Sequence, residues 1–133
     1  MRLRLKTEEE LRTLGRKIGA FVKLPKVICL KGEIGSGKTT LVKAIAEGMG
    51  ISGAFVRSPT FTILNEYETS RGKLLHADLY RVEDLSLEEF SIEGLLIIEW
   101  PKKTTKCDCT IEFYIEEPIR ILDFSNCQEL WKV

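Results

Sequence analysis

The segment GEIGSGKT, residues 32–39, constrains this chain more than any other part of the sequence. It follows the apolar run KVICLK and precedes KTTLVKAIAEGMG, whose pattern favours a helix. The spacing fits G-x-x-x-x-G-K-[ST], in which glycines let backbone N–H groups turn towards phosphate oxygens. The N-terminus of the helix adds its positive dipole end. A glycine-rich turn into a capped helix is the alternative, but the order of strand, motif and helix favours a nucleotide-binding loop.

The residues of this loop have separate expected tasks. The Lys38 ammonium would reach the β- and γ-phosphates, which makes it a candidate catalytic group as well as a binding group. The Thr39 hydroxyl would join the coordination shell of a magnesium ion. The residues expected to bind the nucleotide are Ile34, Gly35, Ser36, Gly37, Lys38, Thr39 and Thr40.

Two acidic residues end apolar segments, and either would suit a magnesium site beside the loop. LLIIE ends in Glu99 and LLHAD ends in Asp78, and both runs are typical of buried strands. One acid would hold magnesium, directly or through water, while the other orients or activates the attacking water. An acid solvated at a strand end is the alternative for each. We therefore expect Lys38, Asp78 and Glu99 to be catalytic, and Thr39, Asp78 and Glu99 to be metal ligands.

HADLYR, residues 76–81, contains the only histidine in the chain. The period of two in a strand places His76, Asp78 and Tyr80 on one face and Arg81 on the other. The polar face would look towards the nucleotide, and Arg81 would anchor the loop or stabilise charge. For His76 the residues leave two roles open, one structural and one catalytic.

SPTFT, residues 58–62, lies between the expected loop helix and the first acid. Nucleotide hydrolases place a threonine that senses the γ-phosphate in such a position, and Thr60 is the candidate. A proline-containing lead-in to a strand is the alternative.

The remaining pattern predicts an α/β fold in one domain, residues 1–133. TEEE is a capping box with Thr7 as N-cap, and it opens a helix that runs to about Phe21. FTILNEYET and KLLHADLY flank the turn SRG as a hairpin, and CTIEFYIEE and IRILDFS form a later one. Residues 82–94 would hold a short helix. The result is a mixed β-sheet flanked by helices, with antiparallel hairpins in the later part.

Composition restricts the partners and the compartment. The chain has 20 basic and 20 acidic residues, so its net charge does not draw it to nucleic acid or membrane. No apolar run approaches the roughly 20 residues that span a bilayer, and the N-terminal segment becomes polar too early for a secretory signal. Cys29, Cys107, Cys109 and Cys127 lack metal-site spacing, and a CDC strand would place Cys107 and Cys109 on one face. We expect a cytoplasmic protein with reduced thiols.

From Leu5 to Pro101 the chain resembles the TsaE (YjeE-type) family of bacterial ATPases. The likeness rests on GEIGSGKTT, on SPTF followed by NEY, on HADLYR, and on IIEWP at 97–101. These segments occur in the family's order and at its spacing, which makes the resemblance highly specific.

The resemblance implies a P-loop NTPase-like fold and ATP hydrolysis with magnesium held around Thr39 and Glu99. Asp78 would be essential for turnover, and Trp100 would be a functionally sensitive aromatic beside Glu99 unless it only caps a strand before a proline. The switch-like or partner-coupled residues would be Thr60, His76, Tyr80, Arg81 and Trp100. Family members act with a TsaB–TsaD pair in threonylcarbamoyl-adenosine modification of tRNA, so tRNA would be engaged through that complex. The sequence leaves the oligomeric state open.

Three other classes fit the nucleotide loop less well. A small P-loop kinase would need room for an acceptor and a lid, and no arginine-rich lid segment is visible. A GTP-binding switch would carry an N-K-x-D pattern, which the sequence lacks. A non-hydrolysing nucleotide-binding subunit would not need both Asp78 and Glu99.

Overall fold

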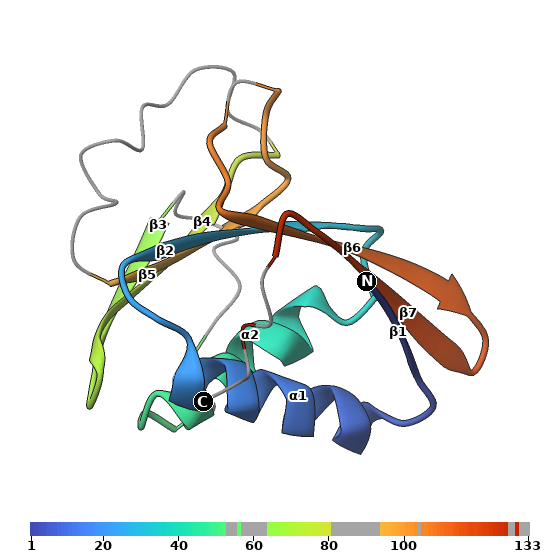
Figure 1. Ribbon diagram of the computed structural model, residues 1–133, viewed down its shortest axis with the longest axis horizontal. Coiled ribbons are helices and arrows are strands. Elements are labelled where there is room, and N and C mark those ends of the chain that lie inside the picture. The colour runs from blue at the N-terminus through green and yellow to red at the C-terminus, as the bar shows by residue number, and fades with distance from the viewer. Residues whose placement is uncertain (53–55, 57–63, 81–93, 104, 128–129, 131–133) are drawn as a thin grey trace.

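One mixed sheet and two helices make up the part of the chain that the computed structural model describes, residues 1–52, 56, 64–80, 94–103, 105–127 and 130. Seven strands are hydrogen-bonded in the order β1-β7-β6-β2-β5-β4-β3 (Figure 1). The elements are β1 Arg2–Leu5, α1 Glu8–Phe21, β2 Lys26–Lys31, α2 Lys38–Gly48, β3 Leu64–Thr69, β4 Gly72–Asp78, β5 Leu95–Glu99, β6 Cys109–Glu116 and β7 Ile119–Ser125.

The central strands of the sheet are parallel and its outer strands are antiparallel. β6, β2, β5 and β4 run parallel to one another, while β7 and β1 continue from β6 as antiparallel strands. β3 pairs antiparallel with β4 across the two-residue turn Ser70–Arg71. The predicted α/β class and both predicted hairpins are confirmed. Because the parallel strands point the same way, the C-terminal ends of β2, β4 and β5 lie at one edge of the sheet.

Both helices pack on the same face of the sheet (Figure 1). Thr7 caps α1 as predicted, because its Oγ1 accepts a hydrogen bond from the Glu10 N–H at 3.1 Å. The two helices approach very closely at Gly19, where a Cβ atom would lie 2.0 Å from the Ile45 carbonyl oxygen. Glycine is therefore required there, and the contact fixes α2 and the loop before it against the core.

Side chains of the central strands divide between two apolar clusters, one on each face. The cluster on the helix side includes Ile28, Leu30, Leu74, Leu95 and Ile97. The cluster on the opposite face consists of Cys29, Leu75, Ala77, Leu79, Leu96 and Ile98. β5 is buried along its whole length, as its uninterrupted apolar sequence predicts. Each buried leucine or isoleucine contributes about 1.5–3 kcal/mol, so the strand ends rest on a well-packed base.

Strand β1 was not among the elements predicted from the sequence. Its residues RLRL alternate between charged and apolar, which is a strand pattern of minimal length. Leu3 and Leu5 pack against the helix-side cluster, and β7 supplies the partner that such a short segment needs. The expected short helix at 82–94 falls almost entirely outside the described residues.

The prediction of reduced thiols is wrong for the structure. Cys29 bonds to Cys107 and Cys109 bonds to Cys127. Cys107 and Cys109 also do not share a face, because Cys107 precedes β6 and packs on the cluster opposite the helices, whereas Cys109 belongs to the helix-side cluster. Sequence spacing could not show this, since the connection before β6 and the end of β7 bring each pair together. The cysteines therefore give no support to a reducing compartment.

No helix among the described residues is long and apolar enough to cross a membrane.

Candidate nucleotide-binding site

The glycine-rich segment forms the turn between β2 and α2, at the centre of the sheet (Figure 1). Gly37 is the N-cap of α2 with φ +111° and makes no side-chain cap hydrogen bond, and the first turn of α2 has no acidic residue. A Cβ atom at Gly37 would lie 2.9 Å from Cδ2 of Leu11. The loop therefore requires glycine here, and it presents a helix N-terminus suited to an anion.

Lys38 is 5% exposed and sits between the loop and the acids. Its Nζ donates a hydrogen bond to the Gly32 carbonyl and lies 4.1 Å from the centroid of the Trp100 ring. Burial lowers the pKa of Lys38 below its usual value, and the negative charges of Glu99 and then Asp78 oppose that shift. The ammonium group of Lys38 therefore interacts electrostatically with both carboxylates.

Asp78 and Glu99 end neighbouring parallel strands and are register partners. Glu99 is 5% exposed, and its Oε2 lies 2.6 Å from Nε2 of His76. Asp78 is half-buried, and its Oδ1 accepts a hydrogen bond from the Tyr80 N–H at 2.9 Å. The two acids therefore share one edge of the sheet but have different partners.

Two aromatic side chains cover this edge. Tyr80 and Trp100 meet edge to face, with ring centroids 5.0 Å apart, and Tyr80 is 62% exposed. The backbone N–H of Trp100 donates a hydrogen bond to the backbone carbonyl of Leu30 at 3.2 Å, which ties the end of β5 to β2 beside the loop. Tyr80 lies beyond the end of β4, which is at Asp78. The prediction that Tyr80 shares a strand face with His76 and Asp78 is therefore wrong.

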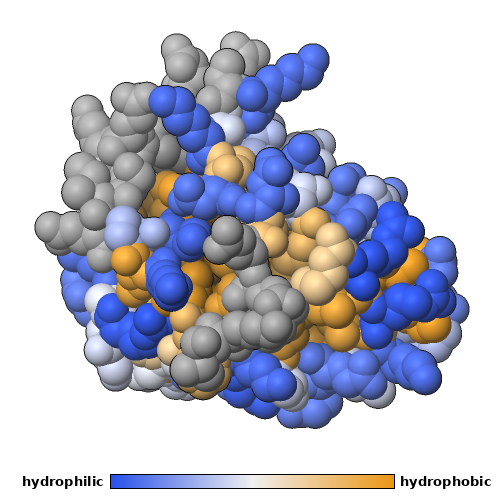
Figure 2. Space-filling view, in the orientation of Figure 1, coloured by the Kyte–Doolittle hydropathy of each residue, from blue (hydrophilic) through white to orange (hydrophobic). Residues whose placement is uncertain are grey.

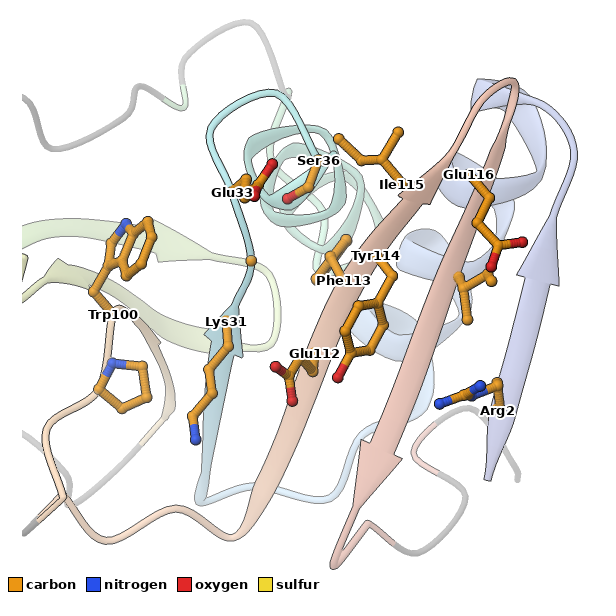
Figure 3. Close-up of a pocket in the computed structure, with 13 residues that line it drawn as sticks. Arg2, Lys31, Glu33, Ser36, Trp100, Glu112, Phe113, Tyr114, Ile115 and Glu116 are labelled. Atoms are coloured by element: carbon orange, nitrogen blue, oxygen red, sulfur yellow. The ribbon is translucent and has the colours of Figure 1, made fainter.

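A groove of about 870 Å³ adjoins the loop on the sheet face opposite the helices. Figure 3 shows Trp100 on one side of it and the strands β6, β7 and β1 on the other. Its lining includes Lys31, Glu33, Glu112, Tyr114 and Arg2 together with Ser36 of the loop. Glu112 and Tyr114 were not predicted as site residues. Their alternation with core residues in β6 does indicate that they face away from the core.

The face of the molecule seen in Figure 2 is mixed in character. Figure 2 shows hydrophobic residues in patches that are interrupted by hydrophilic side chains. Ile34, at the turn of the loop, is 92% exposed. The turn of the loop is therefore accessible to solvent within the described part of the chain.

The described residues fit a nucleotide with magnesium. Ser36 is 1% exposed and its Oγ has no hydrogen-bond partner among the described residues, which leaves a buried polar atom beside the loop. No group of three or more His, Cys, Asp or Glu side chains in the described part of the chain is arranged to hold a metal alone. Magnesium usually keeps several waters and takes phosphate oxygens, so it needs only one or two protein carboxylates.

The structure brings together most of the predicted site. Lys38, His76, Asp78, Glu99 and Trp100 converge at the sheet edge beside the loop. Thr39 and Thr40 begin α2 and are half-buried. Thr60 and Arg81 lie outside the described residues.

Known proteins share this chain's sequence and its fold. Residues 5–121 match the model of the family described as "Threonylcarbamoyl adenosine biosynthesis protein TsaE". A relative from Aquifex aeolicus, named tRNA threonylcarbamoyladenosine biosynthesis protein TsaE, is 47% identical over 112 residues, which cover 84% of each chain. A relative of the same name from Bacillus subtilis is 43% identical over 97 residues, covering 69% of this chain and 61% of that protein.

A solved structure, titled as the crystal structure of Bacillus subtilis YdiB, superimposes with a TM-score of 0.70. It is 30% identical and covers 93% of this chain and 83% of its own. The agreement supports the predicted P-loop NTPase-like fold.

Proposed function

The chain belongs to the TsaE family, and on that premise we propose that it is a magnesium-dependent ATPase supporting threonylcarbamoyl-adenosine modification of tRNA. The observation that carries the ATPase proposal is the convergence of Lys38, Asp78 and Glu99 beside the glycine-rich loop. A loop at a helix N-terminus can bind phosphates, and two carboxylates next to the bound γ-phosphate can serve hydrolysis.

In the proposed mechanism, the tasks are divided among the loop, Lys38, Thr39 and the two acids. The loop N–H groups and the Lys38 ammonium bind the β- and γ-phosphates. Thr39, Glu99 and Asp78 are the residues that would hold magnesium, which when bound offsets the phosphate charge. Asp78 also orients the attacking water and accepts its proton, because it is the less enclosed of the two acids.

We propose a partner-dependent enzyme that acts with a TsaB–TsaD pair and meets tRNA through that complex, in the cytoplasm. The exposure of Ile34 and Tyr80 and the groove beside the loop support this proposal, because a partner that binds these exposed groups would order water and transition-state charge in the site. Hydrolysis by the chain alone should therefore be slow. Net charge near zero also suits a protein that leaves RNA contact to its partners.

The deciding experiment is a measurement of magnesium-dependent ATP hydrolysis, first alone and then with the TsaB–TsaD pair. We expect stimulation by the pair, and we expect Lys38→Ala to lose it together with nucleotide binding. Lys43→Ala is the matched control, since Lys43 lies on the same helix but is exposed. Wild-type turnover in Lys38→Ala would refute the loop assignment.

Product analysis separates this function from a P-loop kinase. Inorganic phosphate as the only new phosphorylated product supports an ATPase, while transfer to a small acceptor would support the kinase. If the TsaB–TsaD pair neither binds nor changes turnover, the ATPase proposal stands and the proposed partnership is wrong.

A further inference from the structure

His76 occupies a position in β4 that usually belongs to an apolar core residue. It is fully buried, and it lies on the helix-side face of β4 between Leu74 and Asp78. A histidine here gives up the solvation of two ring nitrogens. A contact made by at least one of those nitrogens must account for its presence.

The two ring nitrogens of His76 have different surroundings. Nε2 lies 2.6 Å from Oε2 of Glu99, a short contact between two almost fully buried groups. Nδ1 is buried and has no hydrogen-bond partner among the described residues. A histidine that served only the core would be expected to satisfy both nitrogens. The arrangement therefore favours the single bond to Glu99 as the reason for this residue.

The contact also restricts what Glu99 can do. A carboxylate side chain at a strand end can rotate about its terminal bond and present either oxygen. The hydrogen bond from the Nε2–H of His76 engages Oε2, which leaves Oε1 as the oxygen free to face a ligand. Lys38, the pKa of which Glu99 raises more than Asp78 does, contacts the Gly32 carbonyl of the loop.

We propose that His76 is a positioning residue that fixes Glu99 so that a single carboxylate oxygen faces the nucleotide site. This inference rests on the proposed function for its consequence, because one fixed oxygen suits one place in a magnesium shell that also contains water. Glu99 would then offer one oxygen to a magnesium ion or to one of its waters. His76 itself touches neither nucleotide nor metal.

Substitutions matched in length test this role. The amide nitrogen of glutamine stands as many bonds from Cα as Nε2 of histidine, whereas that of asparagine stands only as far as Nδ1. His76→Gln therefore retains a donor that reaches Glu99, and His76→Asn retains a donor that does not. His76→Leu fills the buried site without a donor. Leu74→Ala is the stability control, because it creates a cavity two residues away on the same face of β4.

Three measurements apply to this set. Turnover should fall by about 10–100-fold in His76→Asn and His76→Leu, the usual effect of losing a partner that orients a metal ligand. The magnesium concentration that half-saturates nucleotide binding should rise by about tenfold in the same two variants. ATP affinity at saturating magnesium should change less than about threefold. His76→Gln should recover most of each loss, and Leu74→Ala should lower Tm without reproducing this pattern.

A fourth measurement, by crystallography, is independent of the proposed activity. Crystal structures of the nucleotide-free proteins should show a single Glu99 conformer in the wild type and in His76→Gln. In His76→Asn the Glu99 side chain should be displaced or occupy two conformers. Equal behaviour of the glutamine and asparagine variants would overturn the positioning role. If the wild type binds magnesium nucleotide but never hydrolyses it, the proposed function fails, while magnesium dependence and the Glu99 conformer still decide the role of His76.

Discussion

Asp78 and Glu99 form a natural comparison, because they end adjacent parallel strands in direct register and follow similar apolar sequences. Glu99 is almost fully buried, bonded to His76 and continuous with a connection that is tied to β2. Asp78 is half-buried, and within the described part of the chain it accepts only a local bond from the backbone N–H of Tyr80. The difference lies in their neighbours and not in their own strands.

On the basis of this comparison we propose that the two acids have separate tasks. A carboxylate fixed by a buried partner suits the binding of a ligand in one geometry. A carboxylate with solvent access and a local partner suits proton transfer, which needs a group that can gain and lose a proton. The predictions below test this division, beginning with the largest expected effect.

The first prediction concerns Asp78→Ala. We expect turnover to fall by about 10²–10⁴-fold because the acceptor for the water proton is lost, while ATP affinity stays within about threefold. Stability should change little, because the side chain is half-buried and its one bond among the described residues is to the backbone N–H of Tyr80. Steady-state hydrolysis, calorimetric ATP binding and urea unfolding give the three quantities.

Asp123→Ala is the control for that experiment, since Asp123 also lies on a strand but pairs with Arg2 at the surface. It should leave turnover intact. An equal loss of binding and turnover in Asp78→Ala would make Asp78 a structural or binding group and would remove the proposed difference between the two acids.

The second prediction compares the two disulfides, one of which anchors the connection that follows Glu99. The bond between Cys29 and Cys107 closes a separation of 78 residues, whereas the bond between Cys109 and Cys127 closes 18. In the chain-entropy model the first contributes about 4.5 kcal/mol and the second about 3 kcal/mol. The double variant Cys29→Ala/Cys107→Ser should therefore lose more unfolding free energy than Cys109→Ala/Cys127→Ser.

Urea unfolding of the oxidised wild type and both double variants measures these differences. Because Trp100 lies in the connection that Cys107 anchors, only the first variant should also loosen the Glu99 side of the site. Equal losses in the two variants would show that the loop-length argument does not govern this fold.

The third and smallest prediction uses Lys38 as a probe of both acids. Glu99 raises the pKa of Lys38 more than Asp78 does, against the lowering by burial. Glu99→Gln should therefore lower the pKa of Lys38 further than Asp78→Asn, as measured by ¹³C NMR titration of the Lys38 Cε. The opposite order would place Lys38 closer in effect to Asp78.

The same shift predicts a pH dependence of stability. Since the pKa of Lys38 is lower in the folded than in the unfolded chain, the unfolded chain binds more protons between the folded-state value and 10.5. The contribution of Lys38 to unfolding free energy therefore increases as pH rises through that window. Urea unfolding at a series of pH values should show this increase over a wider pH range in Glu99→Gln. In Lys38→Met the Lys38 contribution to unfolding free energy should be absent.

Much of the site could be predicted because its residues carry local signals. GEIGSGKT predicts its own turn and helix through glycine spacing, and the apolar runs before Asp78 and Glu99 predict buried strands whose ends are near the loop. The helix cap at Thr7 and both hairpins follow from local residues in the same way. The two-residue turn at Ser70–Arg71 and the prolyl turn before β7 need no distant information.

Contacts between distant segments could not be predicted from such signals. β1 is too short to be recognised without β7 beside it, and the reduced-thiol prediction failed because each disulfide joins segments that only the sheet order brings close. The bond between His76 and Glu99 crosses from β4 to β5, and the cation–π contact joins Lys38 to Trp100. The groove depends on β1, β6 and β7 together.

The sequence by itself therefore determined the glycine-rich loop, the buried character of β4 and β5 and the two acids at their ends, because these depend on spacing along the chain. Only the tertiary structure decided that Glu99 is enclosed and Asp78 is accessible. The physical reason is that burial and hydrogen bonding are set by neighbours in space, and β4 and β5 lie side by side although the 16 residues 79–94 separate them along the chain.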